Sequence, residues 1–294
     1  AECWDLVNTA EQTRRHCMML ENCCYDFFEM ATLNMAQQGL FGDVMHAEGA
    51  YIHDLRSYNY DTTATGYKNM WRLKAQKEEA GNPYPTHGLG PVAQILNIHR
   101  GDRMATLVSM SNAQKGMHLY AAEHDIAGED TARIDMGDMN TTLIRTAKGK
   151  TIMIQHDVTS PRPYNRIHMV SGTKGFAQKY PLTGIALEPN AHEFVSQQTL
   201  DSLLKVYEHP FCKEIGEKAR KVGGHGGMDF IMDYRLIHCL KNGLPLDMDV
   251  YDAAEWSCLV ELTDYSVRNG SVPVQIPDFT RGEWDKLQGL TFAE

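Results

Sequence analysis

The sequence predicts an α+β fold, in which a short α/β segment precedes a larger unit built on an open, mostly antiparallel β-sheet flanked by helices. Three observations support this prediction. Helical and strand patterns alternate over residues 1–51, five strand patterns follow one another between residues 103 and 180, and three helical patterns come after them. Consecutive strands without long helices between them are typical of an antiparallel sheet.

The first segment shows α/β alternation. Residues 2–16 have the small or apolar positions among charges that are typical of a helix, and the apolar run 17–20 has the length of a strand. A second helix is expected over 25–38, because Gly39 follows it as a C-terminal cap would. Residues 43–51 then have strand character.

The middle of the chain is rich in strand patterns. Alternation is clearest in Ile152-Met153-Ile154, and the turn residues 147–150 predict a hairpin between two of the strands. An antiparallel sheet needs only one face covered by its own helices, so an open face could pair with a second copy of the chain. The expected strands are 103–109, 131–145, 151–157, 165–172 and 176–180.

Helices are expected at the end of the chain, over 194–207, 228–240 and 250–269, the last of them closing at Gly270. The glycine cluster 223–227 follows no strand, so it fails the context test for a dinucleotide-binding fingerprint.

Composition excludes several classes of function. The net charge is 28 − 38 = −10 without a basic block, so the chain would repel the phosphates of a nucleic acid. No apolar run approaches the roughly 18 residues of a membrane span, and the acidic, helical opening does not predict a signal peptide. The compartment, cytoplasm or periplasm, stays open. We expect reduced, buried thiols and no metal site from the seven cysteines, at 3, 17, 23, 24, 212, 239 and 258.

The segment 82–91 carries the strongest local signal for chemistry. Two prolines hold the approach extended, and a phenol at Tyr84 and an imidazole at His87 precede two glycines that permit close backbone approach. Fixed tyrosine and histidine side chains suit proton transfer. The alternative is a rigid loop that caps a helix starting near Leu89.

Three further residues are candidates for the site, and each of them also has a non-functional interpretation. Strand alternation places Tyr51 and His53 on one face, either in a site or at a solvent-exposed strand end. Arg72 beside Trp71 suits a sugar or carboxylate pocket, although arginine is more often on the surface.

Two more candidates lie later in the chain. Tyr164 follows two prolines and is either a site residue or an ordinary aromatic at a strand start. His225 lies among glycines, at a pocket rim or in a flexible turn. The sequence shows no paired catalytic carboxylates, no G-x-S-x-G nucleophile motif and no H-x-x-x-H metal motif. The tyrosine and histidine candidates therefore indicate proton transfer, but they do not identify a substrate.

Several motifs together resemble glycoside hydrolase family 109, NAD-dependent α-N-acetylgalactosaminidases of the glucose–fructose oxidoreductase and inositol dehydrogenase superfamily. The resemblance spans nearly the whole chain, and Tyr-Pro-Thr-His-Gly-Leu-Gly-Pro is its most specific part. The residues that carry it are Glu2–Trp4, Met19–Asn22, Gln38–Gly42, His53–Arg56, Tyr84–Gly90 and Gly224–Phe230.

The resemblance implies a Rossmann domain, of which residues 1–22 would be the end, and a substrate-binding and oligomerisation domain over 23–294. Asn22 would be the remaining NAD contact, and His87 and Tyr84 would transfer protons, in a division of roles that stays open. A terminal N-acetylgalactosaminide would be bound by Tyr51, Arg72, Pro85, Thr86 and Tyr164.

The implied reaction is redox-assisted and differs from two-carboxylate hydrolysis. NAD⁺ would oxidise C3 of the sugar, the C1–O bond would break by elimination after loss of the C2 proton, water would add, and the hydride would return. Two alternatives remain: an NAD(P)-dependent sugar or inositol oxidoreductase, and a non-catalytic sugar-binding or oligomerisation fragment.

Overall fold

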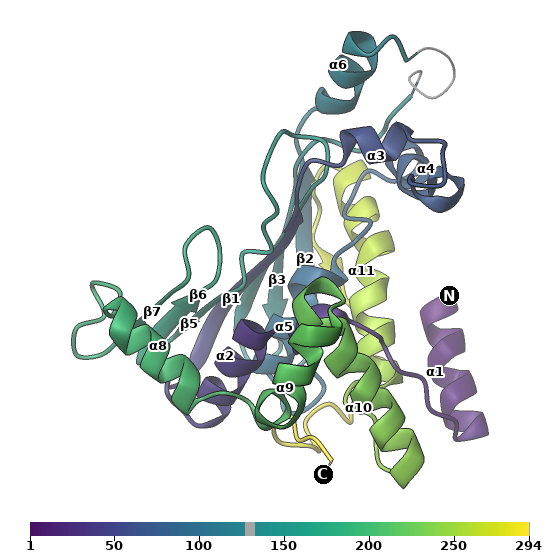
Figure 1. Cartoon of the computed structure of the whole chain (residues 1–294). Helices are drawn as coiled ribbons and strands as arrows, with labels where there is room; N and C mark the ends of the chain where they lie inside the picture. The colour runs from purple at the N-terminus through teal and green to yellow at the C-terminus, as the bar shows by residue number, and fades with distance from the viewer. Residues whose placement is uncertain (127–132, 294) are drawn as a thin grey trace.

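A computed structural model of the chain describes residues 1–126 and 133–293 and contains one eight-stranded sheet (Figure 1). The strand order is β7-β6-β5-β1-β4-β3-β2-β8, and every pairing is antiparallel except that of β1 with β4. The α+β class with an open, mostly antiparallel sheet is therefore confirmed. The strands are β1 (Val44–Ile52), β2 (Met104–Ser111), β3 (Asn140–Thr146), β4 (Thr151–Asp157), β5 (Met169–Gly172), β6 (Gly175–Gln178), β7 (Gly184–Leu187) and β8 (Val274–Gln275).

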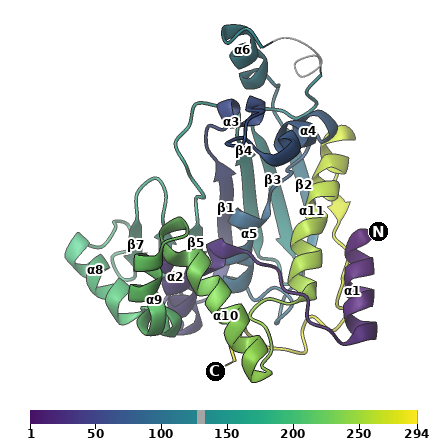
Figure 2. The same cartoon turned by 45° about the vertical axis from the view of Figure 1, so that its right-hand side comes forward.

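Helices α5 and α11 lie across the same face of the sheet, and α1 packs against α11 (Figure 2). No helix of the described residues is long and apolar enough to cross a membrane. The α-helices are α1 (Glu2–Thr13), α2 (Phe27–Gln37), α3 (Arg56–Tyr60), α4 (Trp71–Glu78), α5 (Thr86–Ile95), α6 (Gly116–Glu123), α8 (Gln197–Val206), α9 (Pro210–Val222), α10 (Met228–Asn242) and α11 (Val250–Arg268), and the 3₁₀ turns are η1 (Asn22–Tyr25), η2 (Lys68–Met70) and η3 (His225–Gly227).

The expected α/β segment at the start is wrong in one respect. The apolar run 17–20 forms no strand. Cys17, Met18 and Met19 instead pack, half-buried, against the core as a connecting segment. The one strand of this region, β1, pairs with β4 and β5 at the centre of the common sheet and does not belong to a separate α/β unit.

Later predictions are confirmed with changed boundaries. The expected strand 131–145 is reduced to β3, and residues 131–132 of it lie outside the described part of the chain. The expected strand 165–172 is reduced to β5, because Ile167 and His168 take positive φ angles of 59° and 47°. The pattern did not predict β7, α3, α4, α6 or α9.

The two faces of the sheet differ in burial. Leu107, Ile144 and Ile154 are buried on the covered face, as alternation requires. On the other face Leu143 lies opposite Val108 and Met153 in register, and its side chain is 55% exposed. The open face is therefore apolar in part.

Helix α5 contacts strand β1 backbone to backbone. A Cβ atom on Gly49 would overlap the carbonyl of Gly88, and one on Gly88 would overlap the backbone nitrogen of Ala50. Glycine and Pro91 are poor helix formers, but α5 forms because most of it is buried in the core. The contact fixes the start of α5 beside the end of β1.

A buried ion pair ties the loop after α5 to α11. Nε2 of His99 lies 2.8 Å from a carboxylate oxygen of Glu255, whose other oxygen accepts a hydrogen bond from the backbone of Met104. Burial alone would lower the pKa of His99, but the charge of Glu255 and its hydrogen bond raise this pKa to about 9.

We expect Gly88→Ala to lower the free energy of unfolding by about 3 kcal/mol, because its methyl group would push α5 away from β1. Gly39→Ala is the matched control: its φ is +76° and a methyl group there meets open space, so its cost should be about 1 kcal/mol. Urea denaturation measures both, and equal losses would contradict the packing argument.

The His99–Glu255 pair predicts a pH dependence of stability. Because the pKa of folded His99 is about 9 and the ordinary value is 6.5, the stabilisation is complete below pH 6.5 and disappears as the pH rises towards 9. Its size is at most about 3.5 kcal/mol, since the pKa differs by 9 − 6.5 = 2.5 and one pKa unit is worth about 1.4 kcal/mol. Urea denaturation between pH 6 and 9.5 should show the loss in the wild type and a flatter profile in His99→Gln.

Candidate active site

The site is built at the carboxyl end of strand β1. Tyr51 lies there, opposite His156 of β4 in the parallel register, and it is 7% exposed. Its ring centroid lies 4.8 Å from those of Tyr84 and His53 and 5.2 Å from that of His87. Tyr51 and His53 are therefore not an exposed strand end, and strand alternation brings them together as predicted.

Arg72 of helix α4 is enclosed by aromatic rings. Its guanidinium carbon lies 4.5–5.0 Å from the ring centroids of Tyr51, Tyr67, Trp71 and Tyr84, a distance at which cation–π attraction is effective. It also donates a hydrogen bond of 3.1 Å to the hydroxyl of Tyr51. At 6% exposure Arg72 is not a surface arginine.

Burial and this cation set the protonation of the neighbouring groups. Burial raises the pKa of Tyr51 well above its usual value, although Arg72 partly opposes the shift, so the phenol keeps its proton. Burial and then Arg72 lower the pKa of His53 to about 4 and that of His156 to about 3. At neutral pH the site therefore holds neutral imidazoles at these positions.

The segment Tyr84–His87 forms the entrance to α5. Pro85 is buried at the N-cap position, and Thr86 is half-buried at the first helical position. The hydroxyl of Tyr84 lies 3.4 Å from Nε2 of His87. Burial raises the pKa of Tyr84, which keeps this phenol protonated as well. The helix starts at Thr86 and not near Leu89, so His87 lies in its first turn.

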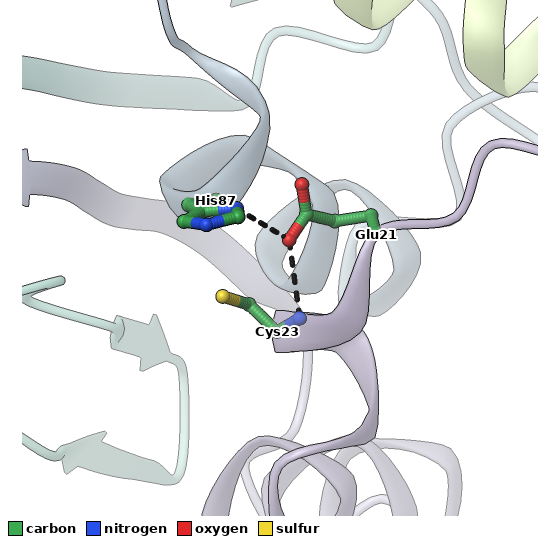
Figure 3. A group of neighbouring side chains, drawn as sticks. All are labelled: Glu21, Cys23 and His87. Carbon is green, nitrogen blue, oxygen red and sulfur yellow. Dashed lines mark hydrogen bonds and ion pairs between the residues drawn. The ribbon is translucent and has the colours of Figure 1, made fainter. Parts of the chain in front are cut away.

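Glu21 meets the other side of the imidazole. Nδ1 of His87 lies 2.7 Å from Oε1 of Glu21, a residue that caps the 3₁₀ turn η1 (Figure 3). Burial opposes ionisation of Glu21, but the adjacent His87 and Thr86 side chains and a hydrogen bond from the backbone N–H of Cys23 lower its pKa overall. Glu21 is therefore a buried carboxylate that remains ionised.

Tyr164 approaches from the loop between β4 and β5. Its ring centroid lies 5.1 Å from that of His53 and 6.4 Å from that of Tyr51, and the side chain is 39% exposed. Its hydroxyl accepts a hydrogen bond of 3.0 Å from Arg166, which is itself bound by Asp26 and Glu29. The phenol of Tyr164 is therefore fixed by Arg166 and lies at the solvent-exposed side of the aromatic cluster.

Asn22 lies next to Glu21 on η1, and its amide donates a hydrogen bond of 2.6 Å to Asp229. Asp229 also binds His225, whose side chain is 71% exposed and is not part of the aromatic cluster. A half-buried amide beside the Glu21–His87 pair suits a hydrogen bond to a dinucleotide. The fit to NAD is partial. Asn22 offers a suitable amide, but no glycine-rich phosphate loop follows any of the described strands.

One group among the described residues could hold a metal ion. Donor atoms of Glu21, Cys23 and His87 all lie within 4.8 Å of one another (Figure 3). Burial, followed by the charge of Glu21, raises the pKa of the Cys23 thiol far above its ordinary value. Without a bound cation this cysteine is therefore a protonated thiol.

The structure brings together Tyr51, Arg72, Tyr84, His87 and Tyr164, with Pro85 and Thr86 at the start of α5 and Asn22 on the adjoining turn. Sequence reasoning missed Glu21, Tyr67 and His156. Glu21 is 66 positions from His87 and no local pattern connects the two residues.

Comparison with known proteins gives a consistent assignment. The family description "Glycosyl hydrolase 109, C-terminal domain" matches residues 25–286. An alpha-N-acetylgalactosaminidase of Bacteroides fragilis is 61% identical over 288 residues, which are 97% of this chain and 68% of that protein. A glycosyl hydrolase family 109 protein of Porphyromonas gingivalis is 53% identical, over 99% of this chain and 64% of its own length.

Solved structures share the fold at low identity. A crystal structure of an NAD binding oxidoreductase from Klebsiella pneumoniae has a TM-score of 0.64 at 11% identity, covering 94% of this chain and 70% of that one. A levoglucosan dehydrogenase in complex with NADH and levoglucosan has a TM-score of 0.59 at 15% identity, covering 90% and 66%.

Proposed function

This chain belongs to glycosyl hydrolase family 109, and we propose that it is the sugar-binding part of an enzyme that hydrolyses terminal α-N-acetylgalactosaminides with the help of NAD. The observation that carries the proposal is the convergence of three tyrosines, His87 and the buried Arg72 at the end of β1. The 61% identity to the Bacteroides fragilis enzyme supports the substrate class.

His87 and Tyr84 transfer protons in this proposal. They take up and return protons at C2 of the sugar and at its C3 hydroxyl, because the imidazole and the phenol lie 3.4 Å apart and form a connected pair. Burial raises the pKa of Tyr84, so the phenol keeps its own proton at rest.

Tyr51, Arg72 and Tyr164 bind the sugar, and Pro85 and Thr86 shape the adjoining wall. The cation of Arg72 is fixed among rings and suits the polar oxygens of a hexose. Tyr164 is the most exposed of the three and accepts its hydrogen bond from Arg166, which leaves its own proton free for the ligand.

Asn22 would hold NAD at the border of this cluster. When bound, NAD supplies a reversible acceptor for the hydride at C3 of the sugar. Solved structures with the same fold hold NADH, which supports NAD as the cofactor. We further propose that residues 1–22 end a dinucleotide-binding domain, that residues 23–294 form the substrate domain, and that the partly apolar open face of the sheet pairs subunits in a homo-oligomer.

A second candidate is an NAD-dependent sugar or inositol oxidoreductase. The fold shared with levoglucosan dehydrogenase and with an inositol dehydrogenase homologue favours it. The two candidates differ in their products, since an oxidoreductase accumulates NADH and the glycosidase returns its hydride. A non-catalytic sugar-binding fragment would neither hydrolyse the glycoside nor form NADH.

The test is hydrolysis of an aryl α-N-acetylgalactosaminide with and without NAD⁺, by this chain and by this chain fused behind the unmatched portion of the Bacteroides fragilis relative. We expect NAD⁺-dependent release of the aryl group without net NADH from the fusion. His87→Ala should lower kcat by roughly 10²–10⁴-fold, since that is the usual contribution of a positioned proton-transfer group.

The exposed His192 provides the control, because His192→Ala should leave kcat unchanged. Net NADH formation from free sugars would favour the oxidoreductase. Sugar binding by calorimetry without any turnover would favour the non-catalytic module.

Arg72→Lys should raise KM about tenfold with a smaller change in kcat, which corresponds to about 1.4 kcal/mol of lost binding. Lysine keeps the charge but loses the planar stacking on the rings and the hydrogen-bond geometry to Tyr51. Steady-state kinetics on the aryl glycoside measures the effect, and a wild-type KM would contradict the sugar-binding role.

A further inference from the structure

His87 lies between a carboxylate and a phenol. Its Nδ1 faces Glu21 (Figure 3), at 2.7 Å from Oε1 of that residue. Its Nε2 is 3.4 Å from the hydroxyl of Tyr84. We propose that Glu21 is a positioning residue that fixes the tautomer of His87, with the proton on Nδ1 and the lone pair of Nε2 facing Tyr84. This inference rests on the proposed function and gives a role to Glu21, to which the sequence analysis assigned none.

The charge of Glu21 dictates the tautomer. Its side chain is 2% exposed, and a buried ionised carboxylate persists only when donors surround it. The backbone N–H of Cys23 donates to Oε1 at 3.1 Å, and the Thr86 side chain adds a hydrogen bond. If Nδ1 of His87 carried no proton, two acceptors would face each other at 2.7 Å. The proton therefore belongs on Nδ1.

Packing holds Glu21 in place. It caps the turn η1 through its own bond to Cys23, so the turn cannot rotate without breaking a buried hydrogen bond. On helix α5, a Cβ atom at Gly90 would lie 2.9 Å from Cγ of Glu21, 3.0 Å from Sγ of Cys24 and 3.0 Å from the ring of Trp256. The glycine leaves the space in which the carboxylate reaches His87.

The fixed tautomer gives proton transfer a direction. A proton leaving the sugar moves to the phenol oxygen of Tyr84 while the phenol's own proton moves to Nε2 of His87, so Tyr84 ends unchanged and the imidazole gains one proton. Glu21 offsets the positive charge that forms on the ring, as the buried carboxylate of a Ser-His-Asp triad does. When water adds at C1, the reverse transfer delivers the proton to C2, and the proton that the water loses replaces the one that the leaving alcohol takes up, so the site ends as it began.

Glu21→Gln tests the relay, because a neutral amide keeps the shape of the side chain but removes the negative charge that favours a proton on Nδ1 and offsets a protonated imidazole. We expect kcat of the NAD⁺-dependent hydrolysis to fall by roughly 10²–10⁴-fold with KM within about threefold of the wild type. Glu21→Asp keeps the charge and should retain more activity than Glu21→Gln. If Glu21 had only a structural role, Glu21→Gln and Glu21→Asp would lose similar amounts of kcat, and KM would change as well.

Glu48→Gln is the matched control. Glu48 lies 3.2 Å from Nε2 of His46 on strand β1, so this variant also removes a carboxylate from a histidine. We place neither residue in the site, and kcat should not change.

A second readout requires no activity. The ¹⁵N chemical shifts of the His87 ring in the 294-residue chain should report a proton on Nδ1 in the wild type and a shift towards Nε2 in Glu21→Gln. A proton on Nε2 in the wild type, or wild-type kcat in Glu21→Gln, would overturn the proposal. If no variant of the fusion hydrolyses the glycoside, the proposed function fails, and the ring shifts still decide the role of Glu21.

Discussion

The contact between Gly49 and Gly88 is the constraint on which the site depends. Strand β1 carries Tyr51 two positions after Gly49, and α5 carries His87 directly before Gly88. Because the two backbones touch, the tyrosine and the imidazole cannot lie far apart, and their ring centroids are 5.2 Å from each other. The phenol of Tyr84 enters the same space because α5 begins only two residues after it.

Buried charged side chains fix the loop that carries Tyr164, although burying them costs desolvation free energy. Arg166 and Glu29 are nearly fully buried, and the Arg166 guanidinium connects α2 to the hydroxyl of Tyr164. Burial opposes ionisation of Glu29, but Lys179 and Arg166 lower its pKa to about 2. Removing one partner of such a pair typically costs about 3–5 kcal/mol, so the loop that carries Tyr164 is held firmly.

The sequence predicted what depends on local patterns. Helix α11 follows an Asp249 capping box and ends before Gly270, and β4 alternates as Ile152 and Ile154 show. The strand expected at 17–20 failed because an apolar run can pack on a core without pairing. Contacts between residues far apart in the chain could not be predicted from local patterns. The burial of Arg72 depends on aromatic rings from three segments. Glu21 contacts His87 only when α5 is packed in its place.

The protonation states of the site argue against two-carboxylate glycoside hydrolysis. That route needs one carboxyl group that is protonated and one that is ionised on either side of the scissile bond. Glu21 is ionised, buried and already engaged by His87, so it has no proton to give to a leaving group. Burial keeps Tyr51, Tyr84 and Tyr164 protonated, and His53 stays neutral because its pKa is about 4. Phenols and imidazoles exchange protons with hydroxyl groups and with an acidified C–H bond, which is the chemistry that a redox-assisted elimination requires.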